Sequence, residues 1–196
     1  MKPFAMKTYS KSPIIWFLLL LTTTIILPIS CRDSHENYSQ TTNVSLMSND
    51  LITTMCQKTP YPSSCETRLR SDPRSSTADS KSLILIMIDV IKSRFSDSFI
   101  HARDMSKSTT DPKMSRALKE CMACYSAVTD ADVKSAIYFV QTGDPKFALQ
   151  AMYDAGIEAD SCQREFQGDV PPFFVDRTRE LKEISAIAAA LVQTMF

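Results

Sequence analysis

The chain of 196 residues contains only three glycines. Hairpins of β-sandwiches and β-barrels usually need residues that tolerate a positive φ, so this scarcity argues against a turn-rich β fold and favours helices. Basic and acidic side chains are balanced at 22 each, and no basic run occurs. The chain therefore lacks the positive surface typical of nucleic-acid binders, and we expect no nucleic-acid partner.

Residue patterns of catalytic and metal sites are also missing. The two histidines, His35 and His101, have no nucleophile motif beside them. The sequence has no glycine-rich phosphate loop, no His-Glu-x-x-His motif and no acidic loop with calcium spacing. We expect neither a metal nor a cofactor, and a protein that is not an enzyme. The enzymatic alternative is a hydrolase whose scattered carboxylates converge only in the folded chain.

The longest apolar run lies near the N-terminus. Three lysines precede residues 14–27, which are apolar except for three threonines. The run is shorter than the roughly 20 residues that cross a bilayer, so we interpret residues 1–31 as a secretory signal peptide and expect no membrane contact after its removal. Cleavage after Cys31 fits the sequence at least as well as cleavage after Ser30, which leaves the fate of Cys31 open.

Residues 32–46 are rich in serine, threonine and asparagine and lack apolar periodicity. This composition predicts a flexible leader before an ordered domain of residues 47–196. The leader contains two glycosylation sequons, at Asn37 and Asn43, which agree with passage through the secretory pathway.

The ordered domain shows helical periodicity, with apolar residues recurring every three or four positions. Asp-Pro pairs occur three times, and we expect at least two of them to open helices, because Asp caps a helix and Pro fits its first turn. Short connections make successive helices antiparallel, so we predict an all-α, up-down-up-down four-helix bundle. The predicted helices lie near residues 78–104, 111–141, 145–167 and 173–195, after a short helical hairpin near 47–71. The third helix is indicated by Phe147, Ala151, Asp154 and Ile157.

Six cysteines in a small secreted chain predict disulfides. Cys56 and Cys65 flank a turn that brings the ends of a hairpin together, which favours a local bridge. Cys121 lies on the apolar stripe of the second long helix, and Cys162 lies at about the same level on the antiparallel third helix. A bridge between them would staple two core helices.

Cys124 is left over and forms a Cys-Met-Ala-Cys sequence with Cys121. No second Cys or His pair completes a metal set, and the helical pattern is not the βαβ context of a thioredoxin-like redox centre. We interpret Cys124 as a buried free thiol, or as a partner for Cys31 if that residue survives processing.

A series of motifs extends through residues 47–196. It comprises Cys56 to Cys65 with its Thr-Pro-Tyr-Pro turn, Leu69 to Pro73, Ala117 to Cys121 followed by Tyr125, and Cys162 followed by Phe166. This series resembles the plant invertase and pectin methylesterase inhibitor family. The resemblance implies a disulfide-bonded four-helix bundle with an N-terminal helical hairpin. The family's cysteine pairing, first with second and third with fourth, agrees with the two bridges above and leaves Cys124 outside the pattern.

The turn after the second long helix bears on the target. Gly143-Asp144-Pro145-Lys146-Phe147-Ala148 resembles the Pro-Lys-Phe motif of the invertase inhibitors, which enters the enzyme's substrate cleft. From the residues themselves, we expect Asp144 to cap the next helix and Pro145 to fix φ, so that Lys146 and Phe147 project from a rigid turn. A glycosidase cleft offers carboxylates and ring-stacking surfaces to such a pair. The resemblance thus implies an inhibitor of plant acid invertase that binds through Asp144, Pro145, Lys146 and Phe147.

Two other functions remain open on this scaffold. In the first, the chain inhibits pectin methylesterase through a polar helical face beside the pectin cleft. Pro145-Lys146-Phe147 is then only a helix start, like Asp111-Pro112-Lys113, and Phe147 is a core residue. In the second, it is an interaction protein with neither activity. As an inhibitor we expect a monomer or a 1:1 complex with the enzyme, secreted to the apoplast and cell wall or to the vacuole.

Overall fold

The computed structural model describes residues 50–196, and the predicted signal peptide, the leader and both sequons lie outside the described residues. Four long helical stretches begin where the sequence supplies a cap or a proline. Asp79 caps the first of them, since its carboxylate accepts a hydrogen bond from the N–H of Ser82 at 2.8 Å. The others begin with proline, which has no N–H to leave unpaired. These helices are α4 (Ser80–Ser108), α5 (Pro112–Ala127), α7 (Pro145–Glu165) and α8 (Pro172–Gln193).

The second predicted helix is present but is not regular throughout. α5 continues through a π-helical turn, η2 (Val128–Asp132), into α6 (Val133–Thr142). The hydroxyl of Thr129 donates to the carbonyl oxygens of Tyr125 and Ser126, at 3.3 and 3.2 Å, and so competes with the backbone N–H groups for these acceptors. The apolar spacing of the sequence did not predict this widened turn.

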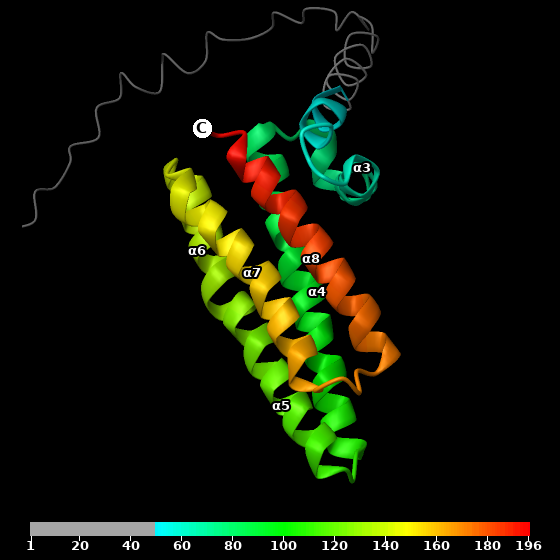
Figure 1. Cartoon of the computed structure of the whole chain (residues 1–196). Helices are drawn as coiled ribbons and strands as arrows, with labels where there is room; N and C mark the ends of the chain where they lie inside the picture. The colour runs from blue at the N-terminus through cyan, green and yellow to red at the C-terminus, as the bar shows by residue number, and fades with distance from the viewer. Residues whose placement is uncertain (1–49) are drawn as a thin grey trace, which may run out of the picture. The chain divides into compact units, whose positions relative to one another are not determined.

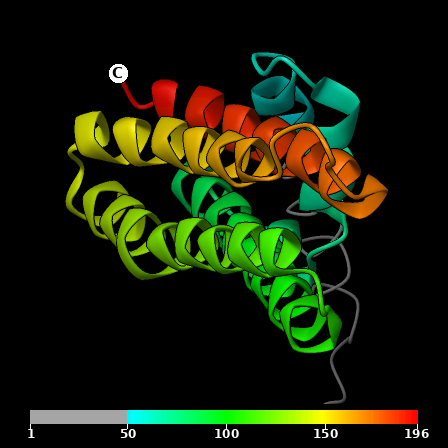
Figure 2. The same cartoon turned by 60° about the horizontal axis from the view of Figure 1, so that its bottom comes forward.

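The four stretches form the predicted up-down-up-down bundle. Successive long helices run in opposite directions, and the N-terminal hairpin lies beside α4 (Figures 1 and 2). α4 and α7 each contact the α5–α6 rod and α8. The two views and these contacts confirm the predicted fold class.

The core is formed mainly by the predicted apolar stripes. Phe95 of α4 meets Tyr125 of α5 edge to face, with the ring centroids 5.8 Å apart, and both side chains are fully buried. On α7 the periodic residues that indicated the helix are not all buried: Phe147 and Ile157 are each 56% exposed, which for Phe147 agrees with its expected projection from the turn. The buried face of α7 consists of Ala148, Ala151, Met152, Ala155, Ala159 and Cys162. These mostly small residues allow α7 to pack extensively on α8.

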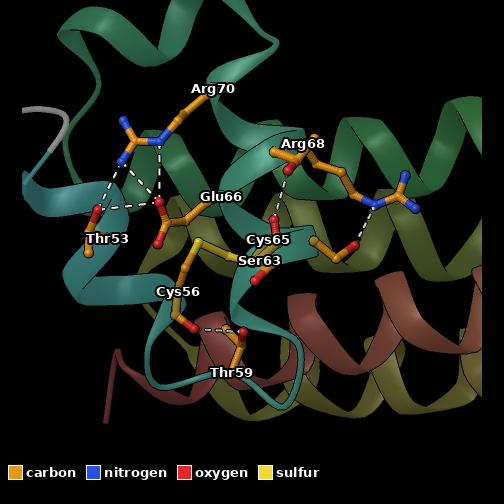
Figure 3. The surroundings of a disulfide bond; sticks show 10 residues. Thr53, Cys56, Thr59, Ser63, Cys65, Glu66, Arg68 and Arg70 are labelled. Carbon is orange, nitrogen blue, oxygen red and sulfur yellow. Dashed lines mark hydrogen bonds and ion pairs between the residues drawn. A yellow bond between two sulfur atoms is a disulfide. The ribbon is translucent and has the colours of Figure 1, made fainter.

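The N-terminal hairpin comprises the helical residues 50–56 and α3 (Pro62–Arg70). Figure 3 shows the disulfide between Cys56 and Cys65 that joins its two arms. The hydroxyl of Thr59 donates to the carbonyl of Cys56 at 2.8 Å and closes the intervening turn. A 3₁₀ turn, η1 (Pro73–Thr77), connects α3 to α4.

One carboxylate ties the hairpin to the bundle. Glu180 of α8 lies 3.3 Å from Arg68 of α3, 3.3 Å from Arg94 of α4 and 2.9 Å from Arg177 of its own helix. Surface pairs of this kind contribute about 0–1 kcal/mol each. Of the three, the pair with Arg68 is the one that connects the hairpin to α8.

The second disulfide, between Cys121 and Cys162, links α5 to α7 and closes a loop with a sequence separation of 41 residues. The chain-entropy relation gives about 3.9 kcal/mol for this loop and about 2.6 kcal/mol for the Cys56–Cys65 loop. Cys124 is half-buried and forms no disulfide in the described residues. Burial and, to a smaller extent, a hydrogen bond with Glu158 raise the pKa of its thiol to about 12, so the thiol is protonated at neutral pH.

No described helix combines the length with the apolar character that spanning a membrane would require.

Candidate functional site

The candidate site is the α6–α7 turn, and the C-terminus of α6 holds it in place. Gly143 has a φ of 81°, a left-handed conformation that glycine adopts without steric cost. The N–H groups of Gly143 and Asp144 both donate to the carbonyl of Phe139, at 3.1 and 3.0 Å. This paired arrangement satisfies the end of α6 and reverses the chain within two residues.

A side chain from another helix also fixes the turn. The ammonium group of Lys81, at the start of α4, donates to the carbonyl of Gln141 at 2.7 Å. A cation at this position satisfies an unpaired carbonyl and interacts favourably with the negative end of the α6 dipole. The turn is consequently attached to the end of the bundle where α4 begins (Figure 1).

Asp144 does not cap α7, so the prediction that it does so is wrong. Its φ and ψ are −110° and 87°, and its carboxylate accepts no hydrogen bond from the first turn of α7. Asp111, at the start of α5, has a ψ of 118° and accepts the N–H of Lys113 at 3.0 Å. The difference lies in the backbone of Asp144, whose ψ of 87° is smaller than the 118° of Asp111. Its exposed carboxylate is therefore not used by the local fold.

Lys146 and Phe147 both face solvent in the first turn of α7. Lys146 is exposed and forms no ion pair with any residue in 50–196. Phe147 is 56% exposed, which rules out the interpretation of this side chain as a core residue. One face of its ring packs on Phe139, with the centroids 4.7 Å apart and the ring planes 31° apart. The turn thus presents an unpaired cation next to an accessible aromatic ring.

Sequence reasoning missed three side chains that shape this region. Phe139 supports Phe147, Tyr138 packs edge-on against Phe139 with centroids 5.1 Å apart, and Lys81 fixes the end of α6. The adjacent aromatic residues before Gly143 were a signal in the sequence. No pattern indicated Lys81, because its contact spans 60 residues of the chain.

An acidic strip lies where η2 faces α7. Partial burial and, to a smaller extent, the nearby negative charges of Asp154 and Glu158 raise the pKa of Asp132 to about 6.

Within residues 50–196 there is no cluster of three or more side chains suited to a metal ion. His101 stacks on Phe173 with the centroids 3.5 Å apart, which is a packing role. The exposed Lys146 and Phe147 make the turn suited to binding through charge and apolar contact.

Comparisons with known proteins agree with this geometry. Residues 50–191 match the family described as plant invertase/pectin methylesterase inhibitor. The chain is 36% identical over 141 residues to cell wall / vacuolar inhibitor of fructosidase 1 of Arabidopsis thaliana, covering 72% of this chain and 67% of the relative. It is 30% identical over 155 residues to a pectinesterase inhibitor of Actinidia deliciosa, covering 79% of this chain and 76% of that one.

A solved structure shares the fold. The crystal structure of mutant form A of a pectin methylesterase inhibitor from Arabidopsis aligns with a TM-score of 0.62 and 20% identity, covering 72% of this chain and 95% of that one. The curated relatives are named as inhibitors, which confirms the expectation that the chain is not an enzyme. From the family match over most of its length and from these relatives, the protein belongs to the plant invertase/pectin methylesterase inhibitor family.

Proposed function

We propose that the protein inhibits a plant acid invertase, a β-fructofuranosidase, by inserting the α6–α7 turn into the substrate cleft. The observation that carries this proposal is the exposed, unpaired Lys146 beside the exposed ring of Phe147. A glycosidase cleft holds two carboxylates and apolar surface for a sugar ring. Lys146 would meet the carboxylates, while Phe147 would fill the apolar part of the cleft. Pro145 and Asp144 set the direction of the turn.

The rigidity of the turn supports this mode of binding. Its backbone is held by the two hydrogen bonds to Phe139 and by the Lys81 contact to Gln141. A loop that is already ordered loses little conformational entropy on association, so more of the contact free energy appears as affinity. The relative named an inhibitor of fructosidase, at 36% identity, supports the same target.

The proposal extends to processing and location. Residues 1–31 would be removed as a signal peptide, residues 32–46 would form a leader with candidate glycans on Asn37 and Asn43, and residues 47–196 would form the inhibitor domain. The inhibitor would act as a monomer in a 1:1 complex. The name of the Arabidopsis relative, cell wall / vacuolar inhibitor, supports either of those compartments.

The second candidate target is pectin methylesterase. It is favoured by the 30% identity to the Actinidia pectinesterase inhibitor, which extends over a larger share of the chain than the fructosidase inhibitor match does. In that mode a polar helical face would bind beside the pectin cleft, and the α6–α7 turn would be dispensable.

A parallel titration distinguishes the candidates. The secreted, oxidised protein is added to a plant acid invertase and to a plant pectin methylesterase at mildly acidic pH, and the residual activity of each is followed. Inhibition of invertase alone is the expected result. Inhibition of the esterase alone would overturn the proposal in favour of the second candidate, and inhibition of neither enzyme would indicate an interaction protein.

A further inference from the structure

Three aromatic rings form a continuous row at the end of α6 and the start of α7. Tyr138 lies edge-on to Phe139, and Phe139 lies against one face of Phe147, with centroid separations of 5.1 and 4.7 Å. Both ends of the row are accessible, since Tyr138 is 59% exposed and Phe147 is 56% exposed. We call Tyr138, Phe139 and Phe147 the aromatic row.

Phe139 connects this row to the interior. It is half-buried and packs against the hydrophobic core, whereas its two neighbours face solvent. A phenylalanine on a helix surface otherwise samples several rotamers. Contact with a ring that is itself held by the core restricts Phe147 to one orientation, which lowers the entropy lost when Phe147 binds a partner.

The support from the Phe139 side chain is separable from the turn itself. The backbone carbonyl of Phe139 accepts the two hydrogen bonds that close the turn, and a side-chain substitution leaves that carbonyl in place. The contact from Lys81 to Gln141 is likewise independent of the ring. Removing the Phe139 ring should therefore release Phe147 without opening the turn.

The exposed ends of the row lie beside Lys146. Clusters of solvent-exposed aromatic side chains are typical of surfaces that bind other proteins. Aromatic residues are also enriched at the centres of protein interfaces. Tyr138 has an apolar ring and a hydroxyl, a combination suited to an interface edge where one side is wet. Because the row is continuous with the proposed inhibitory turn, the two form one surface.

We propose that the inhibitory surface includes the end of α6: Phe139 is a positioning residue that orients the Phe147 ring, and Tyr138 contacts the rim of the invertase cleft. This inference rests on the proposed function and extends it, since it assigns to α6 a part of target recognition. The partner that fits is a glycosidase whose carboxylate-lined cleft has an apolar rim.

A double-mutant cycle tests the positioning role in the secreted, oxidised protein. Inhibition constants for acid invertase are measured with Phe139→Ala, Phe147→Ala and both changes together. We expect Phe139→Ala alone to weaken inhibition by about two- to tenfold, the usual worth of an aromatic pair, and to cause no further loss when Phe147 is already alanine. Additive losses, or no loss from Phe139→Ala, would overturn the inference.

Two further variants separate positioning from stability. Phe139→Leu keeps apolar volume against the core but removes the ring, and it should weaken inhibition while unfolding at nearly the same urea concentration as the parent. Tyr138→Ala should weaken inhibition by a similar small factor. Its matched control is Tyr61→Ala, which changes a tyrosine of the N-terminal hairpin that is 46% exposed and should leave inhibition unchanged. Equal effects of the two tyrosine variants would contradict the role of Tyr138.

A fluorescence measurement decides the positioning claim without the enzyme. The single tryptophan, Trp16, lies in the predicted signal peptide, so Phe147→Trp gives the secreted protein one tryptophan at the turn. Adding Phe139→Ala should shift its emission to the red and increase its quenching by acrylamide. Unchanged emission and quenching would overturn the positioning role. If the wild-type protein fails to inhibit invertase while the emission does shift, the proposed function fails and the orientation of residue 147 by Phe139 stands.

Discussion

The same three residue types, Asp-Pro-Lys, begin two helices of this bundle and serve different ends. At Asp111-Pro112-Lys113 the carboxylate of Asp111 caps α5, and the next residue, Met114, is half-buried against the core. At Asp144-Pro145-Lys146 the carboxylate makes no cap, and the next residue is the exposed Phe147. The first start thus uses its side chains for folding, whereas the second leaves them accessible.

The chain before each start also differs. Before α5, Thr109 has an extended ψ of 139°, and the N–H of Asp111 donates to the Thr109 hydroxyl at 3.3 Å. Before α7, Gly143 has a left-handed conformation, and the N–H of Asp144 donates to the carbonyl of Phe139 in α6. The start of α7 thus overlaps the end of α6, whereas α5 begins after a short connection. The Asp-Pro-Lys sequence alone therefore cannot assign a function. The position of the motif in the fold is what supports the proposed one.

Alanine substitution at the two starts should give the largest contrast. We expect Lys146→Ala combined with Phe147→Ala to weaken invertase inhibition by about 100-fold or more, since hot-spot side chains often cost at least about 2 kcal/mol each. Lys113→Ala, at the equivalent position of α5, should leave inhibition unchanged. Residual activity in inhibitor titrations measures both, and the urea midpoint of each variant shows that folding is intact. An equal effect at both starts would remove the turn from the mechanism.

Replacing the aspartate at each helix start should have a smaller effect, on stability, and here α5 should be more sensitive than α7. Asp111→Ala should lower the free energy of unfolding by about 1 kcal/mol, because it removes the acceptor for the Lys113 N–H. Asp144→Ala should change it by only a few tenths of a kcal/mol, because no such bond exists at α7. Urea denaturation of the two variants beside the parent measures both values. A loss at Asp144 as large as that at Asp111 would show that Asp144 stabilises α7 by another route.

Much of the fold could be predicted because its determinants are local. Proline marks the helix starts, apolar spacing marks the helices, and short connections make the helices antiparallel. The cysteine positions likewise placed two bridges that the structure contains. The buried face of α7 could not be predicted in the same way. The apolar residues at 147 and 157 indicated the helix but do not form its buried face, because α8 packs on the alanine face, where the helices approach closely.

The candidate site was predictable only in part for the same reason. The turn residues and the glycine were readable from the sequence, since positive φ and fixed φ are properties of single residue types. Whether Phe147 is accessible depends on which face α7 presents to the bundle, and its support by Phe139 depends on how α6 meets α7. Both are tertiary facts. The failure of Asp144 to cap is likewise a matter of backbone conformation that the letters Asp-Pro do not specify, since the aspartates of Asp72-Pro73 and Asp111-Pro112 do form caps.

Between the two starts, η2 carries a carboxylate whose effect on stability should depend on pH. Partial burial and, to a smaller extent, the negative charges of Asp154 and Glu158 raise the pKa of Asp132 from 3.8 to about 6. Between these values the folded state binds the proton more than the unfolded state does, so this group's contribution to stability falls as pH rises from about 4 to about 6. Asp132→Asn removes the charge, and should therefore stabilise the protein at pH 7.5 but give little gain at pH 4.

Asp130→Asn supplies the matched control, because Asp130 lies on the same π-helical turn but is exposed and pairs with Lys134 at 3.5 Å. An exposed pair contributes little, so this variant should have small effects at both pH values. Urea midpoints at pH 4 and 7.5 measure the four combinations. A stabilisation by Asp132→Asn of the same size at both pH values would assign the gain to packing, since loss of a charge can stabilise the fold only where that carboxylate is ionised.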